Sequence, residues 1–226
     1  MVSLHRHAEK CRWGIYVILD RYLAKKSHLE IAREVIAGGA RVIQLRDKHA
    51  SRSELVEIGR ELRQLTRAAG VTFIVNDYPE VAVEVDADGV HLGQEDRAVH
   101  EARQLVGRDK IVGLSTHTLD QALAAMELPV DYIGVGPVYA TSTKENPWPV
   151  VGVELVRKVK KRVALPIVAI GGITEQCIPE LVAAGADNVA MIGELMRAAH
   201  LREKMESLVQ TFENAKALFE QQPGAR

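Results

Sequence analysis

The chain has 226 residues, of which 47% are hydrophobic and 26% charged, and its formal net charge is -1. This composition suits a globular domain with a large core, and the near-zero charge argues against a general nucleic-acid-binding protein. No apolar run approaches the roughly 18–20 residues of a membrane span, and residues 1–12 lack the apolar segment of a signal peptide. Cys11 and Cys177 form neither a disulfide framework nor a zinc motif, so we expect a cytoplasmic protein that binds neither nucleic acid nor membrane.

Short β-rich runs alternate with helical stretches along the whole chain. The predicted strands are residues 14–19, 41–45, 71–75, 89–91, 110–114, 131–135, 166–170 and 188–192. The predicted helices are residues 28–37, 51–69, 79–85, 95–106, 119–126, 153–163, 175–184, and a final helix that runs to about residue 220. Ser51 and Glu54 have the spacing of a capping box, and Gly70 is placed to end the helix that follows.

About eight strand–helix units with short connections predict parallel strand pairing. We therefore expect an α/β protein, a (β/α)8 TIM barrel, with a doubly wound open sheet as the structural alternative. No linker or change in composition divides the chain, so a single domain over residues 1–226 is expected. Residues 1–12 would be an N-terminal extension and residues 221–226 a frayed tail.

Polar side chains that are unusual in strands follow the predicted strands directly. In a barrel the carboxyl ends of all strands open on one face, and the active site lies there. Residues far apart in sequence would therefore converge. They are Gln44, Arg46, Lys48, Asn76, Asp77, His91, Gln94, Asp96, Ser115, His117, Thr141, Thr143 and Lys144.

The chemistry of this set indicates phosphates. Arg46, Lys48 and Lys144 can supply positive charge and hydrogen-bond donors to oxyanions. Asp77 and Asp96 would be poorly placed beside phosphates unless a cation lay between them, and Mg²⁺ takes one or two carboxylates together with phosphate oxygens.

Glycines after the last two predicted strands suggest a second anion site. Gly171-Gly172 and Gly193 would let backbone N–H groups approach a phosphate. A phosphate site after the seventh and eighth strands is common in this fold. Two anion sites and one metal site predict two phosphorylated small-molecule reactants.

At these residues the chain resembles the thiamine-phosphate synthase family. The resemblance spans nearly the whole chain, and jointly its motifs are highly specific. The stretches that carry it are QLRDK (44–48), VNDY (75–78), ADGVHLGQED (87–96), GLSTHT (113–118), DYIGVGPVYATSTK (131–144), AIGGIT (169–174) and GADNVAMI (185–192).

The resemblance implies a role for each matching residue. Arg46, Lys48, Ser115 and Lys144 would be catalytic. Hydroxymethylpyrimidine diphosphate would be bound by Gln44, Arg46, Lys48, Asn76, Ser115 and Lys144, and the substrate-binding set also includes Leu45 and Asp47 of the QLRDK stretch. Asp77 and Asp96 would hold Mg²⁺. The thiazole phosphate would be bound by Thr141, Ser142, Thr143, Gly172, Ile192 and Gly193. The family often has Ile-Ser where this chain has Ile192-Gly193, which removes a hydroxyl contact but leaves a backbone N–H.

The family's reaction is a transfer that yields thiamine phosphate and releases pyrophosphate. It would condense 4-amino-5-hydroxymethyl-2-methylpyrimidine diphosphate with 4-methyl-5-(2-hydroxyethyl)thiazole phosphate or its carboxylated form, through a pyrimidine-methyl cation. The residues 136–149 are the best candidate for a lid. The sequence leaves the oligomeric state open and is compatible with a homo-oligomer.

Simpler interpretations exist for each residue taken alone. Asp77 and Asp96 could each cap a helix, and His91 could be a buried structural histidine. His117 could face the thiazole site as an acid or base, which would fit a thiazole phosphate tautomerase of the same fold. A non-catalytic regulator that binds a thiamine-related ligand, or an unrelated phosphate-binding barrel, are further alternatives. The complete charged set favours the Mg²⁺-dependent transferase.

Overall fold

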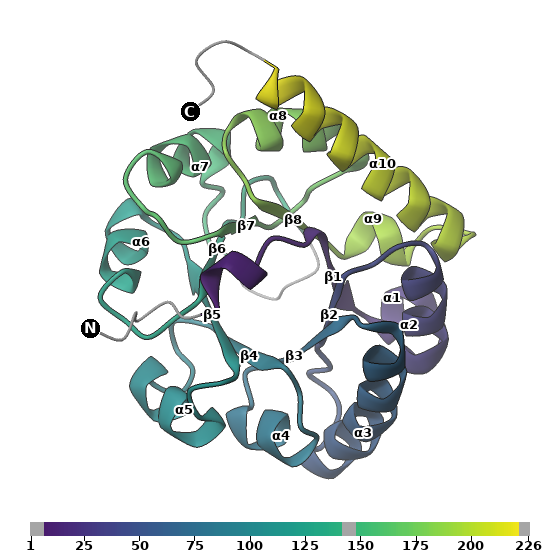
Figure 1. Cartoon of the computed structure of the whole chain (residues 1–226). Coiled ribbons are helices and arrows are strands. Elements are labelled where there is room, and N and C mark those ends of the chain that lie inside the picture. The colour runs from purple at the N-terminus through teal and green to yellow at the C-terminus, as the bar shows by residue number, and fades with distance from the viewer. Residues whose placement is uncertain (1–6, 142–147, 222–226) are drawn as a thin grey trace.

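A computed structural model describes residues 7–141 and 148–221, and within them eight parallel strands close into a barrel ringed by helices (Figure 1). Each strand pairs with the next one along the chain, and β8 pairs with β1. The strands are β1 (Gly14–Leu19), β2 (Val42–Leu45), β3 (Thr72–Asn76), β4 (Gly89–Leu92), β5 (Ile111–Thr116), β6 (Tyr132–Val135), β7 (Ile167–Ala169) and β8 (Asn188–Met191). The predicted (β/α)8 barrel is confirmed, and the open sheet is excluded.

Helices follow the strands and cover the outside of the barrel. The α-helices are α1 (Arg21–Ala24), α2 (His28–Ala37), α3 (Arg52–Ala69), α4 (Pro79–Glu84), α5 (Val99–Val106), α6 (Leu119–Ala125), α7 (Gly152–Lys160), α8 (Ile178–Ala183), α9 (Gly193–Met196) and α10 (Leu201–Glu220). Two short 3-10 helices are η1 (Ala8–Lys10) and η2 (Glu175–Cys177). In Figure 1 the long α10 lies across the outside of the ring beside α8 and α9.

Side-chain caps explain the helix bounds that the sequence predicts best. At α3, Ser51 accepts a hydrogen bond from the Glu54 N–H at 3.3 Å, and the Ser51 N–H donates to Glu54 Oε2 at 2.7 Å. This reciprocal pair is the predicted capping box. Gly70 ends the helix in the left-handed region at φ +66°, which glycine adopts without steric penalty.

The structure differs from the predictions in segments next to loops. The helix expected from residue 95 begins only at Val99, because Asp96 Oδ2 accepts the Gly93 N–H and holds a turn there. The short α1 and α9 were not predicted. Asp20 caps α1 by accepting the N–H groups of Tyr22 and Leu23.

The apolar core forms two layers that the strands separate. The larger layer fills the space between the strands and the helices. The smaller layer lies inside the barrel and centres on aromatic residues: Trp13 contacts the rings of Tyr16 and Tyr132 edge-on, at centroid distances of 5.5 and 5.4 Å. The barrel interior is therefore a packed core rather than a channel.

The amino-terminal segment closes one end of the barrel. In Figure 1 η1 lies in front of the barrel opening, on the side where the strands begin. Asn188 of β8 holds this segment: its Oδ1 accepts from the Trp13 N–H at 2.6 Å, and its Nδ2 donates to Cys11 O at 2.9 Å. Cys11 is fully buried. Residues 7–13 thus form the floor beneath the inner core.

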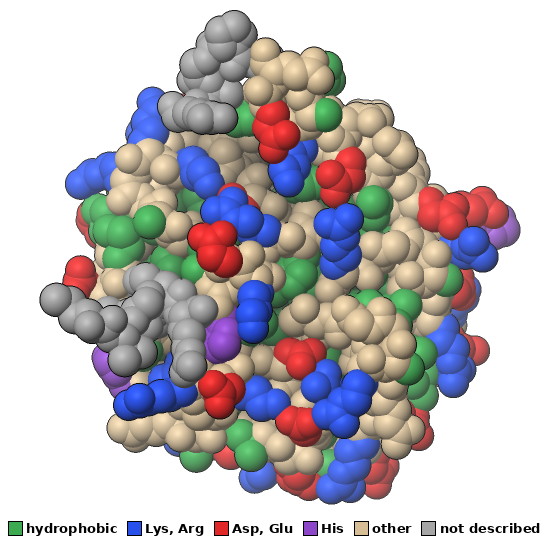
Figure 2. Space-filling view, in the orientation of Figure 1, with side chains coloured by type: hydrophobic (Ala, Val, Ile, Leu, Met, Phe, Trp, Pro, Cys, Tyr) green, Lys and Arg blue, Asp and Glu red, His purple; other side chains and the backbone are tan. Residues whose placement is uncertain are grey.

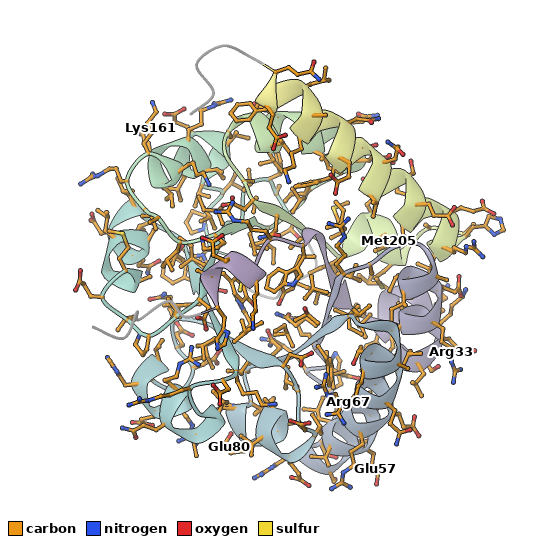
Figure 3. The ribbon with its side chains drawn as sticks, in the orientation of Figure 1. Arg33, Glu57, Arg67, Glu80, Lys161 and Met205 are labelled. Carbon is orange, nitrogen blue, oxygen red and sulfur yellow. The ribbon has the colours of Figure 1, made fainter. Side chains whose placement is uncertain are left out.

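The outer surface is ordinary for a charged, nearly neutral chain. Figure 2 shows acidic and basic side chains interspersed over the floor side of the molecule. In Figure 3 Arg33 and Glu57 lie at the outer rim, whereas Met205 of α10 points inward and is fully buried. No helix within the described ranges is long and apolar enough to cross a membrane.

Candidate active site

A cavity of about 260 Å³ opens at the carboxyl ends of the strands, opposite the floor. It extends from the inner aromatic core, at Tyr16 and Tyr132, to the loops at the rim, at Thr141 and Trp148. Many of the predicted site residues line it together: Gln44, Arg46, Lys48, Asn76, Asp77, Asp96, Ser115, Thr141 and Ile192. Residues more than 140 positions apart therefore meet in one hollow, as the barrel topology predicts.

Two predicted substrate-binding residues turn their side chains away from this cavity. Leu45 is buried in the layer between the barrel and the helices. The Asp47 carboxylate lies 2.8 Å from Arg21 Nε and accepts the His49 N–H at 3.0 Å, so it stabilises the loop before α3. Only the backbone of these two residues remains for a ligand contact. Ser142, Thr143 and Lys144 lie outside the described residues.

The Asp77 and Asp96 carboxyls lie next to each other at the edge of the cavity. Burial, and then the neighbouring Asp96 carboxyl, raise the pKa of Asp77 to about 7, although Lys48 and Arg46 oppose this shift. Two neighbouring carboxyls repel each other when both are ionised, so Asp77 keeps its proton until the pH approaches about 7. Such a pair, with cationic side chains beside it, can hold a divalent cation together with phosphate oxygens.

Neither carboxyl caps a helix. The residue before α4 is Tyr78, and the residue before α5 is Ala98, and neither helix start has a side-chain cap. Asp77 instead adopts φ +65°, and its N–H donates to His91 O at 2.8 Å. The capping alternative weighed for both residues is therefore wrong, and the strained backbone at Asp77 is held by the β3–β4 pairing.

A line of polar side chains runs from the inner core to the cavity wall. Gln44 Nε2 donates to the Tyr16 hydroxyl at 3.0 Å, and the Tyr16 and Tyr132 hydroxyls are 2.9 Å apart. His91 Nδ1 lies 2.9 Å from the Tyr132 hydroxyl, and His91 Nε2 lies 2.9 Å from Ser115 Oγ. The expectation of a structural histidine at His91 misses that its imidazole lines the cavity and contacts a predicted site residue.

His117 lies at the mouth of the cavity. Its Nδ1 donates to Gly136 O at 2.6 Å, since a carbonyl oxygen can only accept. Its ring stacks on Trp148 with centroids 4.5 Å apart and planes 11° from parallel. These contacts fix the imidazole against the loop after β6, which is a positioning arrangement and gives no specific support to proton transfer.

Glycines after β7 let two loops pack closely. A Cβ on Gly172 would lie 2.2 Å from Ala140 O, and one on Gly171 would lie 2.5 Å from Pro137 Cα. Both glycines have positive φ angles, +102° at Gly171 and +63° at Gly172. The loop after β7 therefore packs against the loop after β6, at Pro137 and Ala140. Gly172 and Gly193 do not line the cavity themselves, whereas their neighbours Gly171 and Ile192 do.

A charged cluster links the loops after β7 and β8. Lys204 of α10 donates to Glu175 at 2.8 Å and to Glu194 at 2.5 Å, and Glu194 accepts the Glu175 N–H at 3.1 Å. Burial opposes ionisation of Glu175, but the bonds from Lys204, Ser207 and Thr211 outweigh it and lower its pKa to about 2. The cluster holds the start of η2 against α9, next to Ile192. Nothing in the local sequence pattern predicted it.

Comparison with known proteins gives one consistent answer. The model of a family described as thiamine monophosphate synthase matches residues 15–195. A thiamine-phosphate synthase from Chloroflexus aurantiacus is 45% identical over 187 residues, which cover 82% of this chain and 86% of that protein. One from Methanospirillum hungatei is 46% identical over 184 residues, which cover 81% of this chain and 89% of that protein.

A solved structure agrees with these sequences. A thiamine phosphate pyrophosphorylase from Pyrococcus furiosus superimposes with a TM-score of 0.83 at 40% identity, and covers 90% of this chain and 97% of its own. A 3-hexulose-6-phosphate synthase also superimposes, with a TM-score of 0.67, but at 17% identity it shows the fold alone.

Proposed function

Because the chain belongs to the thiamine-phosphate synthase family, we propose that its cavity joins hydroxymethylpyrimidine diphosphate to the thiazole phosphate, or to its carboxylated form. The products are thiamine phosphate and pyrophosphate. The observation that carries this proposal is the Asp77–Asp96 carboxyl pair beside Arg46 and Lys48 in one cavity. A diphosphate and a divalent cation together match that arrangement of charges.

The carboxyl pair fits Mg²⁺ by a property of this structure. Without a cation, burial and the Asp96 carboxyl raise the pKa of Asp77 to about 7, because a second negative charge is unfavourable there. A bound cation would remove that penalty. Mg²⁺ binds one or two carboxylates and completes its shell with phosphate oxygens and water. Asp77 and Asp96 would hold the ion, and its charge would stabilise the departing pyrophosphate. Among the described residues no group of three or more His, Cys, Asp or Glu side chains could hold a metal, so Mg²⁺ at the two carboxylates would take its other ligands from phosphate oxygens and water.

The protein's side chains would bind the diphosphate and shield the reacting cation from water. Arg46 and Lys48 line the cavity and place positive charge and donors against the diphosphate. As the diphosphate leaves, the aminopyrimidine ring stabilises a methylene cation by resonance, and the thiazole nitrogen attacks it. The floor beneath the aromatic core keeps water from one side of this cation, and the bound thiazole covers the other. Lys144 is proposed to join the cationic set.

The test measures thiamine phosphate formation from the two purified substrates, with Mg²⁺ and with chelator. We expect product only with Mg²⁺, and a loss of at least about a hundredfold in kcat for Asp96→Asn, the size of a lost electrostatic contribution to a transition state. Glu57→Gln, an exposed carboxylate on α3, is the matched control and should keep full activity. A rate of product formation that is unchanged by chelator and by Asp96→Asn would refute the proposed site.

A further inference from the structure

Five polar side chains from five strands form one unbroken line of hydrogen bonds. It runs from Gln44 through Tyr16, Tyr132 and His91 to Ser115, with contacts of 3.0, 2.9, 2.9 and 2.9 Å. Tyr16 and Tyr132 are almost completely buried, and Ser115 faces the cavity. All five residues line the cavity, but the two tyrosines lie buried at its base whereas Ser115 is partly exposed, so the two possible directions of the line are not equivalent.

With a neutral His91 imidazole, counting hydrogens gives two arrangements. Gln44 supplies the hydrogen for the first contact. If Tyr16 then donates to Tyr132, Tyr132 donates to His91 Nδ1, and the imidazole carries its hydrogen on Nε2 and donates to Ser115. If Tyr132 donates to Tyr16 instead, every later contact reverses, and Ser115 donates to His91.

The two arrangements differ in which hydrogen lacks an acceptor. In the first it is that of Ser115, which faces the cavity, where water or a ligand can accept it. In the second it is that of Tyr16, which is 2% exposed at the base of the cavity and whose hydroxyl has Gln44 and Tyr132 as its hydrogen-bond partners among the described residues. A buried donor without an acceptor loses its full hydration, so the first arrangement is favoured. Burial also raises the pKa of both tyrosines, so each keeps its hydrogen.

The neighbouring backbone makes room for this line. A Cβ on Gly113 of β5 would lie 2.1 Å from Tyr132 Cζ and 2.5 Å from its hydroxyl oxygen. The Tyr132 ring therefore crosses β5 only because residue 113 is glycine. On its other side it lies against the His91 ring at a centroid distance of 5.4 Å. The place of the Tyr132 hydroxyl is fixed by packing and does not depend on a ligand.

We propose that Tyr132 and His91 are positioning residues which fix the His91 imidazole with its hydrogen on Nε2 and direct the Ser115 hydroxyl hydrogen into the cavity. The cavity then presents a donor at Ser115, so the atom bound there is an acceptor of the pyrimidine diphosphate. The identity of that ligand rests on the proposed function, whereas the direction of the line does not. Tyr132 and His91 act through Ser115, because each of them already donates its hydrogen within the line and only the Ser115 hydroxyl has a hydrogen left to donate to a ligand.

The direction can be read without any substrate. Nitrogen-15 spectra of the histidine-labelled enzyme, assigned with His91→Asn, report which ring nitrogen carries the hydrogen. We expect Nε2–H in the parent. Tyr16→Phe should keep it, because Tyr132 still donates to Nδ1. Tyr132→Phe removes that donor and should give a mixture of tautomers. Nδ1–H in the parent, or an unchanged tautomer in Tyr132→Phe, would overturn the proposal.

Activity tests whether Tyr132 acts through Ser115. We expect Tyr132→Phe to lower kcat/KM for the pyrimidine diphosphate about three- to tenfold, the range of one neutral hydrogen bond. In a double-mutant cycle, Tyr132→Phe should not lower kcat/KM further in the Ser115→Ala background. Additive losses would show that Tyr132 supports the site by packing alone. If the enzyme forms no thiamine phosphate at all, the proposed function fails while the spectra still decide the direction of the line.

Discussion

Replacing Asp77 by asparagine should stabilise the free protein, and increasingly so as the pH rises. Burial and the Asp96 carboxyl raise the pKa of Asp77 from 3.8 to about 7. Below about pH 4 the group is neutral in both the folded and the unfolded chain and has no effect on stability. Between pH 4 and 7 it ionises only when the chain unfolds, which favours unfolding. Above pH 7 the folded protein carries the full penalty.

The size of the effect follows from the shift of roughly 3 pH units. Each unit corresponds to about 1.4 kcal/mol, which gives an upper value of about 4 kcal/mol. Asp77 is only half-buried, so water reduces the penalty, and we expect about 2–4 kcal/mol above neutral pH. Asparagine suits the site, because it tolerates the φ of +65° found there and its amide can donate to Asp96.

The assay is denaturant unfolding of the parent and of Asp77→Asn, without divalent cations, at about pH 5 and about pH 8.5. The free-energy difference between the two proteins should be about two fifths of its full value at the lower pH and reach its full value at the higher one. Glu57→Gln, whose carboxylate is exposed, should show no such trend. A difference between Asp77→Asn and the parent that is the same at both pH values would refute the assigned carboxyl pair.

Two further substitutions test how the site is supported. Lys204→Met should destabilise the fold by about 1–3 kcal/mol near neutral pH, because Glu175 and Glu194 lose their shared cation. The loss should shrink as the pH falls from 4.5 to about 2 and Glu175 takes up a proton, which thermal unfolding across pH would detect. Gly113→Ala should lower the free energy of unfolding by about 1–3 kcal/mol, because the added Cβ would clash with the Tyr132 ring. Gly134→Ala on the next strand is the control: its Cβ would lie 3.5 Å from His91 Cε1, so the loss should be clearly smaller. Equal losses in denaturant unfolding would contradict the described packing.

The sequence predicts the architecture well because its signals are local. The bounds of β1 and α2 match the prediction at both ends, and Ser51 and Gly70 mark the limits of α3 through contacts within a few residues. The convergence of Arg46, Asp77, Asp96 and Ser115 also followed from sequence, since the barrel places every strand end on one face.

What the sequence could not predict depends on partners far along the chain. The line from Gln44 to Ser115 needs the tilt and register of five strands, and Tyr16 and Tyr132 are 116 positions apart. The Asp47 side chain turns to Arg21, which lies on a helix too short to show a periodic pattern. α5 begins only at Val99 because a turn held by the Gly93–Asp96 hydrogen bond precedes it, and this turn lies next to Asp77, a neighbour that the local pattern does not reveal.

The floor formed by residues 7–13 makes the cavity blind-ended. Asn188 and the aromatic core close its base, so in the part of the chain that the structure describes the cavity opens at the rim near Thr141 and Trp148. A molecule bound at the base of the cavity, against Tyr16 and Tyr132, must enter before any molecule that binds between it and the rim. The same molecule, or the part of the product derived from it, departs last. For the proposed reaction of two substrates, the sealed end would set the order in which they bind and the products leave.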